Sequence, residues 1–234
     1  MKKKALAVLL VLALFVTAAS AKDVGVKVGG ELGMGFDIVK TTAKGTFAGN
    51  TVTQKGSFLN YGFQGSFTAE YEFTDELSLK ASVGLMFAGK TKTTSKFGDS
   101  DTVTNTRNEN GGTYLDVILD AKYKLVDKKN YSFALLGGVE MVSGHVLKTG
   151  NEDTDKDYKN LALGLNAAPE LSFSINKNVD INIGASFSWL FYNNAKALKE
   201  SSSAAEISGK TLLSASYSAT SFYIRPYAGC TYSF

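Results

Sequence analysis

The chain ends on a segment, Phe222 to Phe234, that alternates strictly between two kinds of side chain. The apolar set comprises Phe222, Ile224, Pro226, Ala228, Cys230, Tyr232 and Phe234. The residues between them are polar, small or amphipathic. A period of two predicts a β-strand with one apolar face. An apolar strand at a chain terminus frays and aggregates in water, so this ending is unusual for a soluble protein.

The same alternation occurs throughout the chain. The expected strands cover about 24–38, 58–73, 77–87, 115–125, 131–141, 161–175, 179–191 and 215–234. Short turns are expected at 74–76, 127–130 and 176–178, and polar loops at 39–57, 88–112, 143–160 and 193–212. We expect a bulge at 219–222, where the alternation slips. We also expect bulges at Pro169 and Pro226, because proline has no backbone N–H to donate a hydrogen bond to the neighbouring strand.

Each expected strand has at least the ~9–11 residues that a tilted bilayer crossing needs. Eight is an even number, so both ends of the chain can lie on the short-turn side. The prediction is an all-β fold: an eight-stranded antiparallel up-and-down transmembrane β-barrel over residues 22–234.

Residues 1–21 have the pattern of a cleaved secretory signal peptide. Three lysines precede an apolar run over 5–16, and the small residues Ala19-Ser20-Ala21 follow it. The alternative is an uncleaved membrane anchor. Removal of this segment leaves 22 basic and 22 acidic residues. A neutral mature chain gives no electrostatic support for binding nucleic acid.

Periodicity does not decide which face lies inside the barrel. A lipocalin-type barrel is the alternative, with apolar residues inside around a small apolar ligand. The secretory segment and the contrast between short turns and long loops favour the reverse arrangement. The second face is also rich in Gly and Ser, which fit a narrow lumen and cover a solvated surface poorly.

Aromatic residues gather at both ends of the apolar face, as interfacial anchors do. Those near the short turns are Tyr71, Phe73, Tyr123, Tyr131, Phe173 and Tyr232, and those near the long loops are Phe58, Phe87, Trp189, Phe191 and Phe222.

The chain resembles the small eight-stranded bacterial outer-membrane barrels, such as the OmpA transmembrane domain, OmpX, Ail, the opacity proteins and OmpW. The resemblance is architectural, apart from the final strand. It implies that Tyr232 and Phe234 belong to a signal read by the barrel-assembly machinery. It also implies a bacterial outer-membrane location. We further expect outer-membrane lipid as a partner, a monomer, and no cofactor, metal or catalysis.

Charged residues on the second face must pair if the lumen is closed. We expect Glu31 and Arg225 to pair where the first and last strands meet, with Lys80, Asp120, Lys122 and Glu140 extending the network. Such a network is either a static plug or, as the resemblance to OmpA implies, a gate.

The loops contain weaker candidates. Asp153, Asp155 and Asp157 begin like a calcium loop, but Tyr158 replaces the expected glycine. Ser143 and the only histidine, His145, match a Ser/His pair of lipid A deacylase barrels, with no sign of the other catalytic parts. Loop lysines, such as those at 40, 44 and 55, suit anionic or host ligands.

Two functions follow. The first is a structural or interaction role, adhesion or surface binding, in which the barrel displays four long surface loops. The alternative is a narrow channel for small or apolar solutes, as resemblance to OmpW implies.

Overall fold

The computed structural model describes residues 25–47, 50–97, 103–107, 112–145, 159–193, 206–207, 210–211 and 215–234. The long strands are β1 (Gly25–Phe47), β2 (Asn50–Glu72), β3 (Leu77–Phe97), β5 (Gly112–Lys128), β6 (Tyr131–His145), β7 (Lys159–Ser174), β8 (Val179–Asn193) and β11 (Ala215–Ser233). The short strands are β4 (Val103–Arg107), β9 (Glu206–Ile207) and β10 (Lys210–Thr211).

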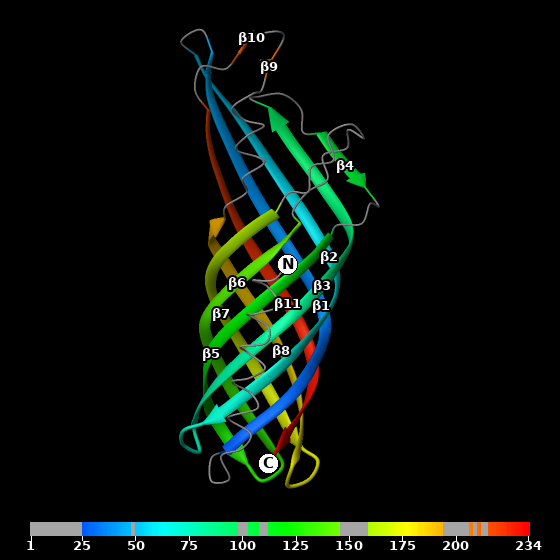
Figure 1. The fold of residues 1–234 in the computed structure, drawn as a ribbon, viewed down its shortest axis with the longest axis vertical. Coiled ribbons are helices and arrows are strands. Elements are labelled where there is room, and N and C mark those ends of the chain that lie inside the picture. Colours follow the sequence, from blue (N-terminus) through cyan, green and yellow to red (C-terminus); the bar gives the residue numbers. More distant parts are fainter. Residues whose placement is uncertain are drawn as a thin grey trace, which may run out of the picture.

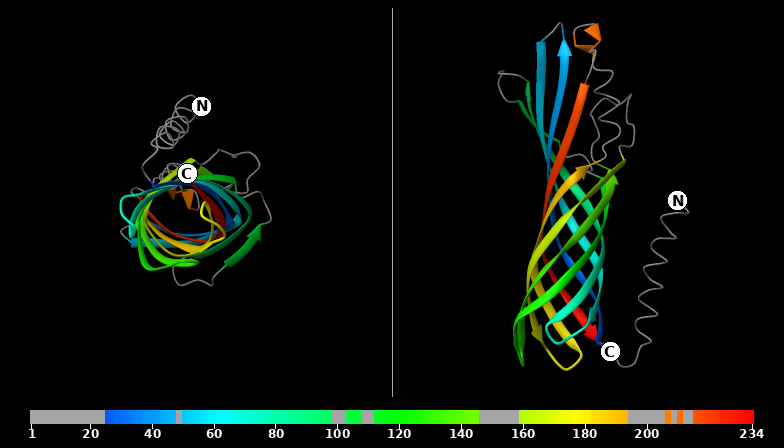
Figure 2. Two further views of the ribbon diagram at one scale, coloured as in Figure 1. Left: turned by 90° about the horizontal axis from the view of Figure 1, so that it is seen from below. Right: turned by 90° about the vertical axis from the view of Figure 1, so that its left-hand side faces the viewer.

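The eight long strands close into one antiparallel barrel. Each pairs with its neighbour in sequence, and β1 pairs with β11 from Lys27↔Ser233 to Gly45↔Ala215. Figure 2 shows the closed ring along the barrel axis, and Figure 1 shows the tilt of the strands. The predicted fold class is therefore confirmed.

The three short turns lie where they are predicted, at the end of the barrel that holds the C-terminus (Figure 1). In the β2–β3 turn the Thr74 hydroxyl accepts a hydrogen bond from the backbone N–H of Leu77, at 3.0 Å. In the β7–β8 turn the side-chain oxygen of Asn176 accepts one from the N–H of Asn178, at 2.9 Å. Such local acceptors favour tight turns.

Two predicted loops are wrong in part. Residues 39–57 form most of the far end of the β1–β2 hairpin, which stays paired up to Phe47↔Asn50. β3 continues to Phe97 and pairs with β4. These segments are rich in Thr, which suits strands, but they lack an apolar alternation because they rise above the apolar belt. The hairpin stands well above the opposite rim of the barrel (Figures 1 and 2).

The predicted bulges are also wrong. The β1–β11 register runs without a shift through 219–222. No shift occurs at Pro169 or Pro226 among the described strand pairs; instead, the ladder misses a few pairs beside each proline. Shifts occur at Tyr61/Gly62, Lys124/Val126 and Leu163/Gly164.

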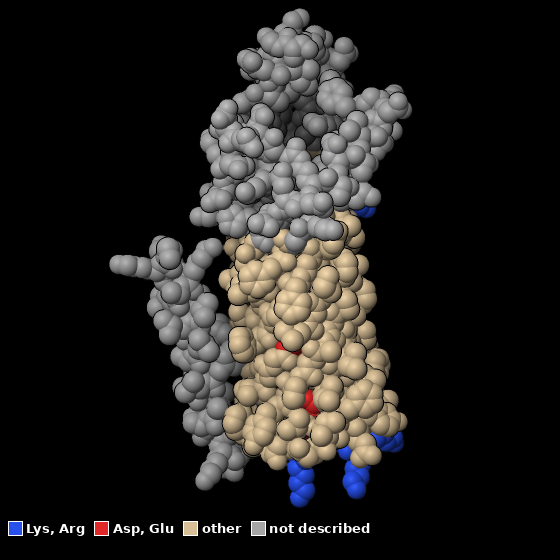
Figure 3. Space-filling view, turned by 90° about the vertical axis from the view of Figure 1, so that its right-hand side faces the viewer, with Lys and Arg blue, Asp and Glu red and all other residues tan. Residues whose placement is uncertain are grey.

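The outer surface is apolar and the lumen is largely polar. Exposed large side chains include Leu32, Phe63, Phe67, Leu119, Val139, Leu165, Ile183 and Trp189. Figure 3 shows the resulting belt, with Lys and Arg side chains only at its borders and little acidic surface on the face in view. The buried set includes Glu70, Lys80, Asp116, Glu140 and Arg225. This is the opposite of a lipocalin interior, so the predicted facing is confirmed. None of the described residues forms a helix long and apolar enough to cross a membrane.

Candidate functional site

The lumen is packed because glycines on one strand make room for larger side chains on the next. Gly84 pairs with Asp116, and a Cβ at Gly84 would collide with the Asp116 carboxylate. A Cβ at Gly184 would meet the ring of Tyr227 at 2.5 Å. The inner face therefore needs small residues at these positions, because larger ones would leave no room for the buried side chains beside them.

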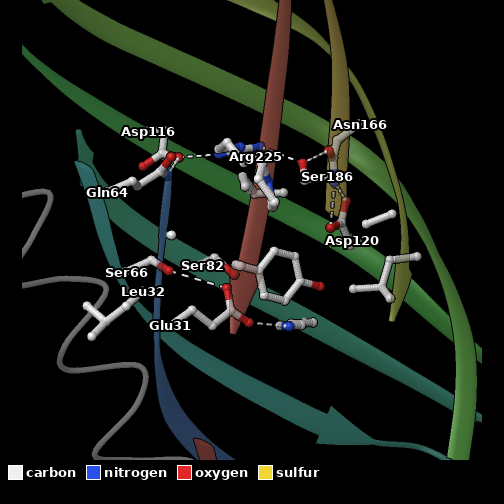
Figure 4. A pocket seen from close by; sticks show the side chains of 17 residues that line it. Glu31, Leu32, Gln64, Ser66, Ser82, Asp116, Asp120, Asn166, Ser186 and Arg225 are labelled. Atoms are coloured by element: carbon white, nitrogen blue, oxygen red, sulfur yellow. Dashed lines mark hydrogen bonds and ion pairs between the residues drawn. The ribbon is translucent and has the colours of Figure 1, made fainter. Parts of the chain in front are cut away.

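An upper ion cluster surrounds Arg225 of β11. Its guanidinium contacts Asp116 of β5 and lies 2.9 Å from Glu140 of β6. It also donates to the Ser186 hydroxyl at 2.8 Å, and the Gln64 amide donates to Asp116 at 2.6 Å. Figure 4 shows Arg225 between Asp116 and Gln64 on one side and Ser186 on the other.

A lower ion cluster is built on two lysines. Lys80 lies 2.6 Å from Glu31 and 2.5 Å from Glu170. Lys122 lies 2.9 Å from Glu70 and 2.8 Å from Glu170. Glu170 therefore joins the two lysines and also accepts a hydrogen bond from the Tyr227 hydroxyl at 2.8 Å. The cluster ties β1, β2, β3, β5, β7 and β11 together across the lumen.

The buried lumen carries more acid than base. Its buried carboxylates are Glu31, Asp37, Glu70, Asp116, Asp120, Glu140 and Glu170, whereas its buried cations are Lys80, Lys122 and Arg225. Asp120 has no ion pair within the described chain and instead accepts hydrogen bonds from the Asn166 amide, at 2.8 and 3.0 Å. Among the described residues, the buried carboxyl groups therefore outnumber the buried cations by seven to three.

An apolar layer lies at the loop end of the polar lumen. It consists of Met86, Ala88, Tyr114, Val142, Ala162, Leu190 and Tyr223, all buried and in one cluster. The Tyr223 hydroxyl donates toward Gln64 at 3.2 Å, and the Tyr223 ring lies 4.7 Å from the Arg225 guanidinium carbon. The layer therefore packs directly against the upper ion cluster.

A cavity of about 40 Å³ lies between the two ion clusters (Figure 4). Polar residues such as Glu31, Lys80, Asp120, Asn166 and Arg225 line it. A few water molecules fill such a volume. The space is too small for an organic solute.

No protein-family model matches the sequence, and no curated protein matches it. Among solved structures, the outer membrane protein OprG from Pseudomonas aeruginosa aligns with a TM-score of 0.50 and 12% identity, over 88% of this chain and 95% of that one. Neisserial surface protein A aligns with a TM-score of 0.46 and 13% identity, over 86% and 97%. At these identities the likeness concerns the fold.

The fold is that of the small eight-stranded outer-membrane barrels. The apolar belt and polar lumen match this architecture, in which side chains alternate between lipid and lumen along each strand. The fold is thus that of a bacterial outer-membrane β-barrel.

The six lumen residues singled out in the sequence, Glu31, Lys80, Asp120, Lys122, Glu140 and Arg225, are all buried inside this outer-membrane barrel. The expected Glu31–Arg225 pair is wrong, because the structure pairs Glu31 with Lys80 and Arg225 with Asp116 and Glu140. Strand adjacency does not fix the level of a side chain: Glu31 is the register partner of Gly229, not of Arg225.

Sequence reasoning missed Glu170, the carboxylate that joins the lower cluster, and the apolar layer. The layer had a detectable signal. Apolar residues stand next to each other there instead of alternating, as in Leu85-Met86-Phe87 and Trp189-Leu190-Phe191. The signal for Glu170 is weaker, because its partners depend on the stagger of four strands.

The remaining candidates lie at the ends of the barrel. Tyr232 and Phe234 are exposed beside the short turns, with their rings 5.2 Å apart in an edge-to-face contact. The Asp153, Asp155 and Asp157 segment and the His145 side chain fall outside the described residues. Within the described part of the chain, no group of three or more His, Cys, Asp or Glu residues is arranged to hold a metal ion.

Proposed function

We propose that the chain is a monomeric, non-catalytic protein of the bacterial outer membrane that displays its β1–β2 hairpin and surface loops for structural or adhesive interactions. In this proposal the barrel is a rigid anchor and the functional surface lies above the membrane. The signal-like segment at 1–21 supports export. The apolar belt supports insertion in a bilayer.

The observation that carries this proposal is the blocked lumen. Two ion clusters and an apolar layer follow one another along the axis, and the cavity between the clusters is about 40 Å³. Each barrier is anchored from several strands, so opening a path requires breaking buried ion pairs. Removing one partner from such a pair costs about 3–5 kcal/mol.

Solute uptake by liposomes that contain the refolded full chain tests this proposal. We expect uptake of small sugars to equal that of empty vesicles. A variant with Met86→Gly and Leu190→Gly opens only the apolar layer and should still show no more uptake than empty vesicles, because the two ion clusters remain closed. Leu119→Gly changes the outer face instead and is the matched control. Uptake by the parent above that of empty vesicles contradicts the proposal.

A narrow channel is the second candidate function, and the cavity between the ion clusters, lined by both acidic and basic side chains, supports it. In this case the ion clusters act as a gate. Glu31→Ala removes one of the two carboxylates on Lys80 and should change the conductance in a planar bilayer. Equal conductance of the parent and Glu31→Ala argues for a static plug.

We also propose that Tyr232 and Phe234 form the signal for the barrel-assembly machinery. Both rings are exposed at the end of β11, where a partner can reach them. Deletion of Phe234 should reduce the amount of barrel in the outer membrane of cells, while refolding into lipid vesicles stays close to that of the parent. Equal losses in both measurements point to a purely structural role.

A further inference from the structure

Lysines gather on the tall side of the barrel, directly above the apolar belt, on described strand segments that contain no acidic residue. There is no Asp or Glu in residues 38–69, 77–98 or 207–234. The same stretches of β1, β2 and β3 contain six lysines beyond the belt: Lys40, Lys44, Lys55, Lys90, Lys92 and Lys96. We call this set the lysine strip.

The register places the strip on one face of the sheet. Lys40 and Lys55 are exposed, at positions that continue the outward rows of β1 and β2. Lys92 is the register partner of Leu59, and Lys96 is the partner of Lys55. Directly paired residues of antiparallel strands share a face. Positions 92 and 96 therefore belong to the outer face.

The bulge at Tyr61/Gly62 determines this placement. Below it, the outward positions of β3 are the odd ones, such as Leu85 and Phe87. Ala88 pairs with Gly62, but Lys90 pairs with Tyr61, so Gly89 is the extra residue. One extra residue exchanges the two faces. Without it, positions 90, 92 and 96 would lie on the lumen side of the sheet.

The strip begins where the belt ends. The Lys40 ammonium lies 5.9 Å from the centre of the exposed Phe222 ring, in a cation–π arrangement. Lys90 pairs with Tyr61, whose ring stacks on Phe36 at 6.4 Å. Aromatic residues at a belt edge mark the level of the lipid headgroups. The first lysines are thus at headgroup height, and Lys44 and Lys55 follow within a few residues along the strands.

We propose that the lysine strip binds the phosphate groups of the glycolipid in the outer leaflet, so that one side of the barrel is fixed to the phosphorylated lipid surface. This inference rests on the outer-membrane location proposed above. Lysine is a point-charge donor that suits phosphate, and a basic residue near an anionic membrane surface strengthens binding about fivefold. The position at the belt edge favours a lipid over a soluble anion.

The test measures the dissociation constant of the refolded full chain for lipid A in non-ionic detergent at low salt. Lipid A carrying both phosphates is compared with the same lipid after removal of its phosphates. The test variant combines Lys40→Gln, Lys55→Gln and Lys92→Gln. The control combines Lys128→Gln, Lys129→Gln and Lys177→Gln, which removes the same charge from exposed positions at the short turns.

We expect the test variant to bind phosphorylated lipid A on the order of 100-fold more weakly than the parent, and the control to match the parent. The difference should shrink at high salt and vanish for the dephosphorylated lipid. Equal binding by all three proteins overturns the inference. A strip that binds soluble polyphosphate but not lipid A also overturns it.

Insertion is scored separately, as protection of the barrel from protease in lipid vesicles. A chain that fails to insert contradicts the proposed function. A chain that inserts but shows no preference for phosphorylated lipid A contradicts only the lysine strip.

Discussion

The outward and inward rows of side chains on the same strand face different surroundings and are constrained differently. On β5, Leu119 is 45% exposed, whereas the next residue, Asp120, is 4% exposed. The outward row needs only to be apolar, because hydrocarbon tails adapt to its shape. The inward row holds charges, and each charge needs a partner at a specific level of the barrel. The outward row should therefore accept exchanges between apolar side chains but not a charged one. The inward row should accept few substitutions of any kind, because each charge depends on a particular partner.

The largest effect is expected from Arg225→Met, which leaves two buried carboxylates without a cationic partner. Asp116 and Glu140 lose their common cation. The free energy of unfolding should fall by about 3–5 kcal/mol, as in other broken buried ion pairs. Urea unfolding of the barrel in lipid vesicles measures this loss. Arg225→Lys keeps the charge and should recover part of it, and an unchanged midpoint for Arg225→Met would show that the cluster is not structural.

The next effect separates the two rows directly. Val83 belongs to the outward row of β3, and Ser82 is buried in the lumen beside the cavity. Val83→Arg places a charge in hydrocarbon and should cost about 2–4 kcal/mol near the midplane. Ser82→Arg should cost less, since the lumen offers carboxylates. Equal losses in the same unfolding assay would argue against the assigned facing.

A smaller effect tests whether lumen glycines are steric requirements. Gly84→Ala forces a Cβ onto the Asp116 carboxylate and should cost about 1–3 kcal/mol, the range for overpacked sites. Gly65 on β2 is the matched control. A Cβ there meets only the Leu32 side chain, at 3.5 Å, so Gly65→Ala should leave the stability close to that of the parent.

The smallest effect is expected at the short-turn end of the barrel. Lys124 pairs with Glu72 at 3.1 Å and with Asp127 at 3.6 Å, and both acids are more accessible than the partners of Lys122. Lys124→Met should cost at most about 1 kcal/mol, and salt should mask the change. Lys122→Met, two residues earlier, should cost several times more. The ratio of the losses in unfolding free energy for Lys124→Met and Lys122→Met shows how strongly the effect of an ion pair depends on its burial near this end of the barrel.

The sequence predicted the parts of the fold that depend on local pattern. The alternation in segments such as 77–87 sets strand and facing together, and residues such as Thr74 and Asn176 mark the turns. It did not predict the length of the β1–β2 hairpin, because residues such as Thr41 and Thr53 carry no apolar period.

The site was predicted only as a set of residues, because its pairing depends on strand stagger. Glu31 and Arg225 both face the lumen on neighbouring strands, yet they lie at different levels and take different partners. A residue's face follows from a period of two. Its level follows from the register of all eight strands, which no single segment contains.

The central claim is that the outward row meets hydrocarbon and the inward row meets the closed lumen. Spin labels placed one at a time at residues 79–86 of β3, in a Cys230→Ser background reconstituted in lipid vesicles, test it directly. Collision with oxygen, which dissolves in hydrocarbon, should be high at Leu79, Val83 and Leu85 and low at Lys80, Ser82 and Gly84. High values at the second set, or no alternation at all, would contradict the account.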